Sequence, residues 1–350
     1  MNGDRSRSGA VAEFVLLTGS LGSGKTTLLK DYLSLPDSGD TAVIVNEAGE
    51  INIDGAIIVS GRRDLPLALL SNGCVCCSVG NDLHAAIDEL VSVRRRTHSA
   101  GFRRIVLETS GLALPGPVLR SLMAYGRGEF RIRIVSTLDP LNPMADEALL
   151  PIQMAQLTAA QSIVFTKLDL ADHAQRSALE RTSVEYNPTA NRIAIADRHA
   201  RARAVFAPDQ AEPRRRFGLF EAMPANAHPR LQVFLAEWPE AVCWPDLRDW
   251  LEDLAGFCGD RLLRVKGLIS VSGMPQPLFI EGVGGVFSEP RRIRLETPTN
   301  EGVVIIARDT SLNELSAFNR SCSASPPCLR LSRGAPYGAS SGFISAAVRP

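Results

Sequence analysis

The chain has 350 residues, and its 38 basic residues balance 38 acidic residues to a formal net charge of zero. This length suits two domains, and a hydrophobic share of 45% is enough for two packed cores. A neutral chain lacks the positive excess with which proteins coat nucleic acids or adsorb to acidic membranes, so we expect neither partner. Only four basic residues are lysines, and each is a candidate for a role that arginine cannot fill: Lys25, Lys30, Lys167 and Lys266.

The location of the protein is predicted from two features. Residues 1–14 are charged and lack the apolar stretch and cleavage site of a secretion signal. The longest apolar runs, 14–17, 42–45 and 303–307, are far shorter than the roughly 20 residues that span a bilayer. The sequence therefore predicts a cytoplasmic protein in a reducing compartment.

After a mobile tail over residues 1–12, short apolar runs alternate with helical segments. A helix is predicted from residue 25 to about residue 35, where Pro36 ends it, and another at 82–96. Five segments rich in apolar residues have the length of buried strands: 13–18, 41–46, 102–108, 130–136 and 162–166. This alternation is typical of a parallel sheet covered on both faces, so we predict an α/β domain with a mostly parallel sheet at 13–195.

The remainder of the chain changes character. Residues 196–229 are rich in Arg, Ala and Pro and are predicted to be a solvated linker. A smaller α+β domain is predicted at 230–318, because its strands and helix alternate less regularly. Residues 319–350 are rich in Ser, Gly and Pro with few large apolar residues, which predicts a disordered tail.

The turn after the first predicted strand matches the phosphate-binding pattern G-x-x-x-x-G-K-[ST] in the required strand–loop–helix context: Gly19, Ser20, Leu21, Gly22, Ser23, Gly24, Lys25 and Thr26. Its backbone N–H groups can wrap a polyphosphate at a helix N-terminus. Lys25 is expected to reach the β- and γ-phosphates and Thr26 to ligate Mg²⁺, with Thr27 next along the helix. The alternative is a glycine-rich turn that matches by chance.

The predicted strand 102–108 ends in Glu108, and a carboxylate there faces the same sheet edge as the phosphate loop. Glu108 can hold Mg²⁺ or a metal-bound water, or orient a nucleophile, while Gly111 lets the next loop sense the γ-phosphate. Together with Lys25, these two residues are the candidate catalytic residues. The alternative for Glu108 is an ordinary residue at a strand end.

The identity of the base is predicted from Thr166, Lys167 and Asp169, which follow the strand 162–166. Many GTPases carry Asn-Lys-x-Asp at this place, where the Asp accepts two hydrogen bonds from guanine and the Lys stem covers the ring. Thr166 stands in the Asn position and alters one polar contact. The pattern predicts GTP rather than ATP. The alternative is an ordinary loop after a strand that happens to carry a charged pair.

Three of the seven cysteines, Cys74, Cys76 and Cys77, lie within four positions. A disulfide between the adjacent pair would close a strained ring. Three thiolates suit Zn²⁺, Co²⁺ or Cu(I), and the sequence has no distant Cys/His pair to close a structural zinc site, so an open, exchangeable site is predicted. The alternative is buried cysteines acting as small hydrophobic residues. The other four cysteines receive no role: Cys243, Cys258, Cys322 and Cys328.

Together these motifs resemble the CobW-type GTP-binding metallochaperones, a family that includes cobalamin-biosynthesis CobW, nitrile hydratase activators and zinc-regulated GTPase metalloprotein activators. The resemblance covers about residues 13–315. Its elements are GSLGSGKTTLL at 19–29, VNEAGE at 45–50, NGCVCCS at 72–78, ETSGLALPGPV at 108–118, TKLDL at 166–170, YNPTA at 186–190, LLRVKGLI at 262–269 and EGVGGVF at 281–287.

The resemblance implies a P-loop domain that hydrolyses GTP slowly, with Zn²⁺ or Co²⁺ on the three clustered cysteines coupled to nucleotide state. It implies that VNEAGE moves with the nucleotide, and that Glu47 or Glu50 completes the metal shell or positions Mg²⁺. A client metalloprotein and a metal-dependent homodimer are the expected partners. The chain departs from the family at Thr166, at Ala48 where Phe is common and at Leu114 where Asp is common, and it has no His-rich stretch.

Three functions are compatible with these residues. The leading hypothesis is a metallochaperone in which GTP binding and hydrolysis control delivery of Zn²⁺ or Co²⁺. The second is a kinase-like P-loop enzyme in which the thiols are incidental. The third is a redox sensor in which oxidation of the neighbouring thiols blocks the nucleotide switch. Neither the metal nor the client follows from the sequence.

Overall fold

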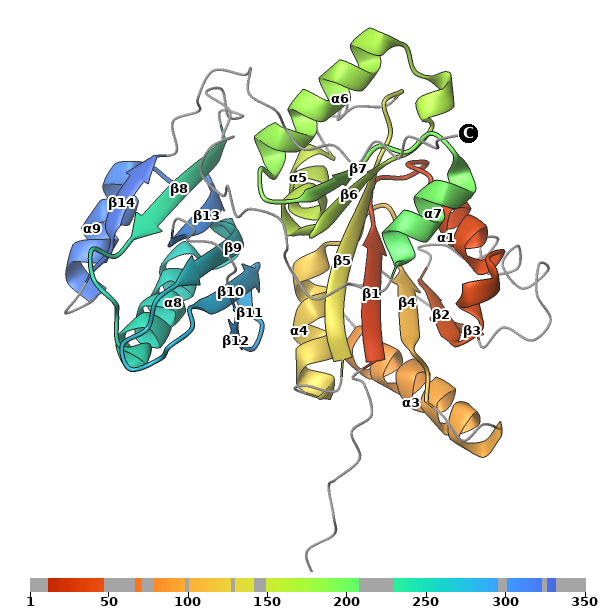
Figure 1. The fold of residues 1–350 in the computed structure, drawn as a ribbon, viewed down its shortest axis with the longest axis horizontal. Coiled ribbons are helices and arrows are strands. Elements are labelled where there is room, and N and C mark those ends of the chain that lie inside the picture. The colour runs from red at the N-terminus through yellow and green to blue at the C-terminus, as the bar shows by residue number, and fades with distance from the viewer. Residues whose placement is uncertain are drawn as a thin grey trace, which may run out of the picture.

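The computed structural model describes residues 12–46, 67–70, 79–97, 101–126, 130–141, 149–207, 230–294, 301–322 and 326–331. Over these residues the chain forms two domains, each built on one sheet (Figure 1). No helix within the described ranges is long and apolar enough to cross a membrane.

The first sheet has seven strands in the described part of the chain, all parallel, in the order β3-β2-β4-β1-β5-β6-β7. This arrangement confirms the predicted parallel α/β domain. The sequence had not shown two strands at the edges, β3 and β7, because three or four residues give no periodic signal. The strands are β1 Ala12–Thr18, β2 Thr41–Asn46, β3 Leu67–Leu70, β4 Arg104–Glu108, β5 Phe130–Leu138, β6 Ser162–Phe165 and β7 Asn191–Ile193.

Helices cover both faces of this sheet. Side chains alternate along each strand, so Phe14 and Leu16 of β1 pack on one side while Val15 and Leu17 pack on the other. Because both sides are buried, apolar residues occupy consecutive positions in central strands such as β1 and β2. The helices on the first side are α3 Val79–Thr97, α4 Pro115–Tyr125, α5 Leu150–Ala159 and α6 His173–Tyr186, and those on the second are α1 Lys25–Leu33 and α7 Arg198–Phe206.

Helix α7 lies within the predicted linker, so that prediction is wrong for residues 198–206. The Asp197 carboxylate caps the helix by accepting from the Ala200 N–H at 2.6 Å. The Phe206 ring stacks on Tyr32 of α1 with centroids 4.0 Å apart, and Arg201 is only 3% exposed. Despite its arginines, α7 has an apolar face, which packs on the first domain. The rest of the predicted linker, from residue 208, lies outside the described residues.

The second domain combines an antiparallel sheet with helices α8 Trp244–Cys258 and α9 Leu312–Cys322, which confirms the predicted α+β class. Its strands, in the described residues, run in the order β11-β10-β9-β13-β8-β14, with β12 beside β10. They are β8 Leu231–Glu237, β9 Leu262–Ile269, β10 Leu278–Val283, β11 Val286–Phe287, β12 Arg291–Arg292, β13 Gly302–Arg308 and β14 Cys328–Leu331. Short 3₁₀ turns occupy Pro36–Ser38, Leu168–Leu170 and Gly259–Arg261.

The predicted disordered tail is wrong at two places, residues 319–322 and β14. Helix α9 continues to Cys322, and β14 pairs antiparallel with β8. Asn319 explains the order, since its buried side chain accepts from Trp250 Nε1 at 3.0 Å and donates to the Pro327 carbonyl at 2.7 Å. One amide thus fixes the end of α9 to the chain that leads into β14.

The two domains share a hydrophobic cluster. In β13, Val303 and Ile305 pack toward α8 and α9, while Val304 and Ile306 join the cluster of the first domain. The second sheet therefore lies between its own helices and helices α4 and α5 of the first domain (Figure 1). The other second-domain members of the shared cluster are Leu231, Val233, Leu235, Leu263 and Val283.

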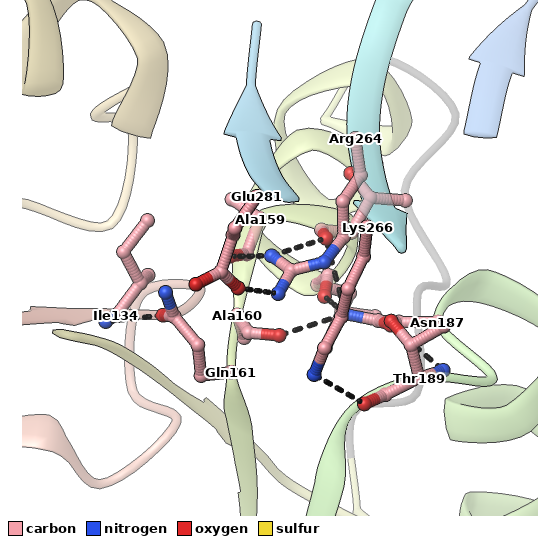
Figure 2. A network of polar contacts seen from close by, with 11 residues as sticks. Ile134, Ala159, Ala160, Gln161, Asn187, Thr189, Arg264, Lys266 and Glu281 are labelled. Carbon is pink, nitrogen blue, oxygen red and sulfur yellow. Dashed lines mark hydrogen bonds and ion pairs between the residues drawn. The ribbon is translucent and has the colours of Figure 1, made fainter. Parts of the chain in front are cut away.

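A buried polar network closes the interface at the end of α5 (Figure 2). Arg264 of β9 is fully buried, donates to the carbonyls of Thr158 and Ala159, and pairs with Glu281 of β10 at 2.6 Å. Asn187 donates to the carbonyls of residues 157, 158 and 160 at 2.9, 3.0 and 2.8 Å. The last carbonyls of a helix have no partner within it, so one side chain from each domain caps α5.

Candidate functional site

The phosphate loop connects β1, in the middle of the first sheet, to α1. Gly19 has φ 136°, and a Cβ at this position would overlap the Thr137 side chain, so only glycine fits. Gly24, with φ 92°, is the N-cap of α1. Ser23 and Thr137 hydroxyls lie 2.6 Å apart and tie the loop to β5. The loop therefore has the strand–loop–helix geometry that the sequence pattern requires.

Lys25, the first residue of α1, places its ammonium inside the loop. Its Nζ donates to the carbonyls of Gly19 and Ser20 at 2.8 and 2.9 Å, and the residue is 7% exposed. A cation is thus held where the loop N–H groups would surround a polyphosphate. Thr27, two residues further on, is exposed on α1, and its predicted nucleotide contact stays a prediction.

Thr26 of α1 and Glu108 at the end of β4 come together at one edge of the sheet. The Thr26 hydroxyl donates to Glu108 Oε1 at 2.5 Å, and Glu108 is 3% exposed. The register of β1 and β4, which pairs Leu17 with Glu108, places the carboxylate beside the loop. The sequence prediction that these two residues share an edge of the sheet agrees with their positions.

Gly111 follows β4 and lies against the phosphate loop. A Cβ added to Gly111 would overlap the backbone nitrogen of Leu21, so the turn after β4 and the phosphate loop are in direct backbone contact. The two loops are therefore packed against each other. This contact puts the predicted γ-phosphate sensor next to the loop that would hold that phosphate.

The Thr-Lys-x-Asp segment lies at the end of β6, beside the same loop. The Thr166 hydroxyl donates to the Ser23 carbonyl at 2.8 Å and is buried, so the residue that departs from the Asn pattern ties β6 to the phosphate loop. Lys167 has the left-handed φ of 49° and forms an ion pair with Asp139. Asp169 is exposed, which leaves its carboxylate accessible to a base.

The sequence reasoning missed Asp139. This residue is 4% exposed and accepts from the Leu141 N–H at 2.8 Å in addition to pairing with Lys167. The strand was predicted to end at Ser136, whereas β5 continues to Leu138, which puts Asp139 at the carboxyl end where ligands of parallel sheets bind. A predicted strand that extended to Leu138 would have placed Asp139 directly at its carboxyl end.

We expect Asp139→Asn to weaken guanine-nucleotide binding by about tenfold, because Lys167 loses the charge-assisted bond that orients it. Titration with a fluorescent GDP analogue measures the change. The matched control is Asp172→Asn, an exposed N-cap of α6 whose replacement still caps a helix. An unchanged affinity in Asp139→Asn would mean that the ion pair does not serve the nucleotide.

The predicted transition-metal ligands, Cys74, Cys76, Cys77 and Glu50, lie outside the described residues. The same is true of Glu47. Helix α3 begins at Val79, just after the cysteines in the chain, and β3 ends at Leu70 on the edge of the sheet that carries the phosphate loop. Within the residues that the structure describes, no group of three His, Cys, Asp or Glu side chains is placed to hold a metal ion.

Of the unassigned cysteines, Cys258 is a core residue. It is 2% exposed at the end of α8, and burial raises the pKa of its thiol to about 11. A thiol with so high a pKa is a poor metal ligand at neutral pH, because the thiolate binds. Cys243 and Cys328 are exposed and lie in the second domain.

A phosphate loop after β1, a carboxylate at the end of β4 and a Thr-Lys-x-Asp segment after β6 define a P-loop nucleotide-binding protein. Residues 13–194 match the family model for the CobW/HypB/UreG nucleotide-binding domain, and residues 232–322 match the cobalamin synthesis protein cobW C-terminal domain. The chain belongs to the CobW/HypB/UreG family. The predicted family and fold are thereby confirmed.

Several known proteins are similar to the chain. It is 29% identical to the zinc chaperone YjiA of Escherichia coli, over 78% of this chain and 86% of that protein. Identity is also 29% to the zinc chaperone CobW of Pseudomonas aeruginosa, over 78% and 80% of the two chains. The crystal structure of Zn(II)-bound YjiA GTPase from E. coli matches 89% of this chain and 98% of its own, with a TM-score of 0.59 at 20% identity. This last likeness supports the fold.

Proposed function

We propose that the protein binds and hydrolyses GTP, and that its nucleotide state controls the binding of Zn²⁺ or Co²⁺ for delivery to a client metalloprotein. The observation that carries the proposal is the convergence of Lys25, Thr26, Glu108 and Thr166 on one edge of a parallel sheet. Two relatives are named zinc chaperones, which supports Zn²⁺ as a metal that this protein binds.

The residues around Glu108 fit Mg²⁺. The Thr26 hydroxyl and the Glu108 carboxylate, 2.5 Å apart, are hard oxygen donors of the kind that Mg²⁺ takes. When bound, Mg²⁺ would neutralise charge on the β- and γ-phosphates. Lys25 would hold the same phosphates, and the Gly111 turn, in contact with the phosphate loop, would respond to the γ-phosphate. Asp169 would bind the guanine edge, with the Lys167 stem over the ring.

In this proposal the metal ion is cargo. Cys74, Cys76 and Cys77, with Glu50, would supply thiolates and an oxygen to Zn²⁺ or Co²⁺. If the nucleotide changes the affinity for the metal, the metal must change the affinity for the nucleotide by the same factor. The client metalloprotein and a metal-dependent homodimer belong to the same proposal, because a second copy could complete the coordination of an open site.

We expect the affinity for Zn²⁺ to be about tenfold higher with a GTP analogue and Mg²⁺ than with GDP, a typical coupling between sites. Anaerobic competition titrations with Zn²⁺ and Co²⁺ in both nucleotide states measure it. Cys76→Ser should lower the affinity for Zn²⁺ by about 100-fold and leave GDP binding unchanged, because it removes one of three thiolates. Cys243→Ser, an exposed cysteine of the second domain, is the matched control.

Equal metal affinities in the two nucleotide states would contradict the proposal. ATP binding without preference for GTP, together with full activity after all three clustered cysteines are changed to Ser, would favour the kinase-like alternative. A change in GTP turnover when metal-free protein is treated with a thiol oxidant would favour the redox sensor. The same titrations also select between Zn²⁺ and Co²⁺ as the preferred cargo.

A further inference from the structure

Gln156 of α5 connects this helix to the turn that carries Gly111. Its side chain is 1% exposed, and its Nε2 donates to the carbonyls of Gly111 and Ala113, both at 3.0 Å. The two bonds use both hydrogens of the amide nitrogen. A glutamate of the same size has no such donors, and an asparagine is shorter by one methylene.

The turn that Gln156 holds is compact and lies on the phosphate loop. The Ala113 N–H donates to the Ser110 carbonyl at 3.1 Å and closes the turn, and Gly111 is in backbone contact with Leu21. Gln156 also lines, with Gly19 and other residues of the loop and β5, a cavity of about 10 Å³, which is room for roughly one water molecule. One buried side chain therefore binds the Gly111 turn and borders the same small cavity as the phosphate loop.

Helix α5 is a fixed support for this side chain. Three residues after Gln156, the carbonyl of Ala159 accepts from Arg264, and Asn187 binds the carbonyls on either side of it. Both capping residues are fully buried. Because the end of the helix is held by two domains, the position of the carboxamide is set by the scaffold, and the Gly111 turn is placed by it.

We propose that Gln156 is a positioning residue for GTP hydrolysis, holding the Gly111 turn against the phosphate loop in the arrangement that reads the γ-phosphate. This inference rests on the proposed function. GDP has no γ-phosphate for the turn to read, so we expect its affinity to depend far less on the turn than the affinity for a GTP analogue does. Binding of a GTP analogue and the rate of hydrolysis do depend on it.

The test compares Gln156→Leu and Gln156→Glu with the wild-type protein. We expect kcat for GTP hydrolysis to fall about tenfold or more, with GDP affinity within about twofold of wild type, since only interactions made with the γ-phosphate are lost. The preference for a non-hydrolysable GTP analogue over GDP should fall in parallel. If these two variants fold poorly, Gln156→Asn serves as a milder change, since it keeps the amide but shortens the side chain by one methylene. It should likewise lower kcat and leave GDP binding intact.

The matched control is Thr158→Val on the same helix. Its buried hydroxyl donates to the carbonyls of Met154 and Ala155, within α5, so the change perturbs the helix without touching the turn. Thr158→Val should keep kcat. Wild-type kcat and an unchanged nucleotide preference in the Gln156 variants would overturn the inference while leaving the proposed function intact. Absence of GTP binding by the wild-type protein would overturn both.

Discussion

Replacing Lys25 by Ala is expected to lower the affinity for GTP by about 100-fold and to abolish measurable GTP hydrolysis, because charge-assisted contacts to the β- and γ-phosphates are lost. The affinity for GDP should fall by about tenfold, since only the contact to its β-phosphate is lost. The ammonium lies 2.8 Å from the Gly19 carbonyl oxygen and 2.9 Å from that of Ser20, inside the loop. Lys25→Arg should fail as well, since a planar guanidinium does not fit a site shaped for a compact ammonium.

Titration with a fluorescent GDP analogue, followed by a GTP hydrolysis assay, measures the effect of Lys25→Ala. The matched control is Lys30→Ala in the last turn of the same helix, which should bind GDP within about twofold of wild type because it is remote from the loop. Tight GTP binding by Lys25→Ala would show that the phosphate loop is not the nucleotide site.

Arg264→Met is expected to destabilise the protein by about 3–5 kcal/mol, because it leaves Glu281 as a buried carboxylate without its closest cation. Arg264 is fully buried and Glu281 is 8% exposed, and the ion pair is 2.6 Å long. The change also removes the donor to the carbonyls of Thr158 and Ala159 at the end of α5. Stability should therefore fall in both domains at once.

Thermal unfolding measures this destabilisation. The matched control is Arg230→Met in the same domain, whose pair with Asp309 is half-exposed and screened by solvent, so its loss should change the Tm little. The double variant Arg264→Met, Glu281→Leu should recover part of the loss, since it removes the stranded charge. A Tm for Arg264→Met equal to that of Arg230→Met would contradict the role assigned to the buried pair.

The effect of the buried pair depends on pH in a defined direction. Burial alone raises the pKa of Glu281, but Arg264, Lys266, a hydrogen bond from Gln161 and Arg291 outweigh it and hold that pKa below its usual value. A lowered folded-state pKa gives stability that is complete above the unfolded carboxyl's pKa, about 4.3, and is lost as the pH falls through the folded value. The difference in Tm between wild type and Glu281→Gln should therefore narrow in acid.

The phosphate site was accessible from sequence because its chemistry is local. The loop from Gly19 to Thr26 is one contiguous pattern, and a strand that ends in Glu108 points to the same edge through the rule for parallel sheets. Asp139 escaped because the end of its strand was placed two residues too early. Gln156 gave no signal at all, since a glutamine inside a helix looks the same whether it faces solvent or two carbonyl groups.

Tertiary contacts explain why two segments that the sequence predicted to lack structure, α7 and β14, are ordered. Helix α7 has an Arg-rich sequence that reads as solvated, yet Phe206 stacks on Tyr32 and Arg201 is buried. Strand β14 lies in a polar segment whose order depends on the amide of Asn319. In each case the stabilising partner lies far away in the chain, and neither periodicity nor composition within the segment reports it.

The hydrophobic cluster that the two domains share limits how domains of this protein can be exchanged with those of a relative. Severed from the first domain, the second sheet would present Val304, Ile306 and Leu263 to water beside a charged Arg264. Such a face favours self-association over an independent monomer. A chimera that takes its second domain from a relative would therefore need α5 and Asn187 from that relative too, so the unit of exchange extends across the domain boundary.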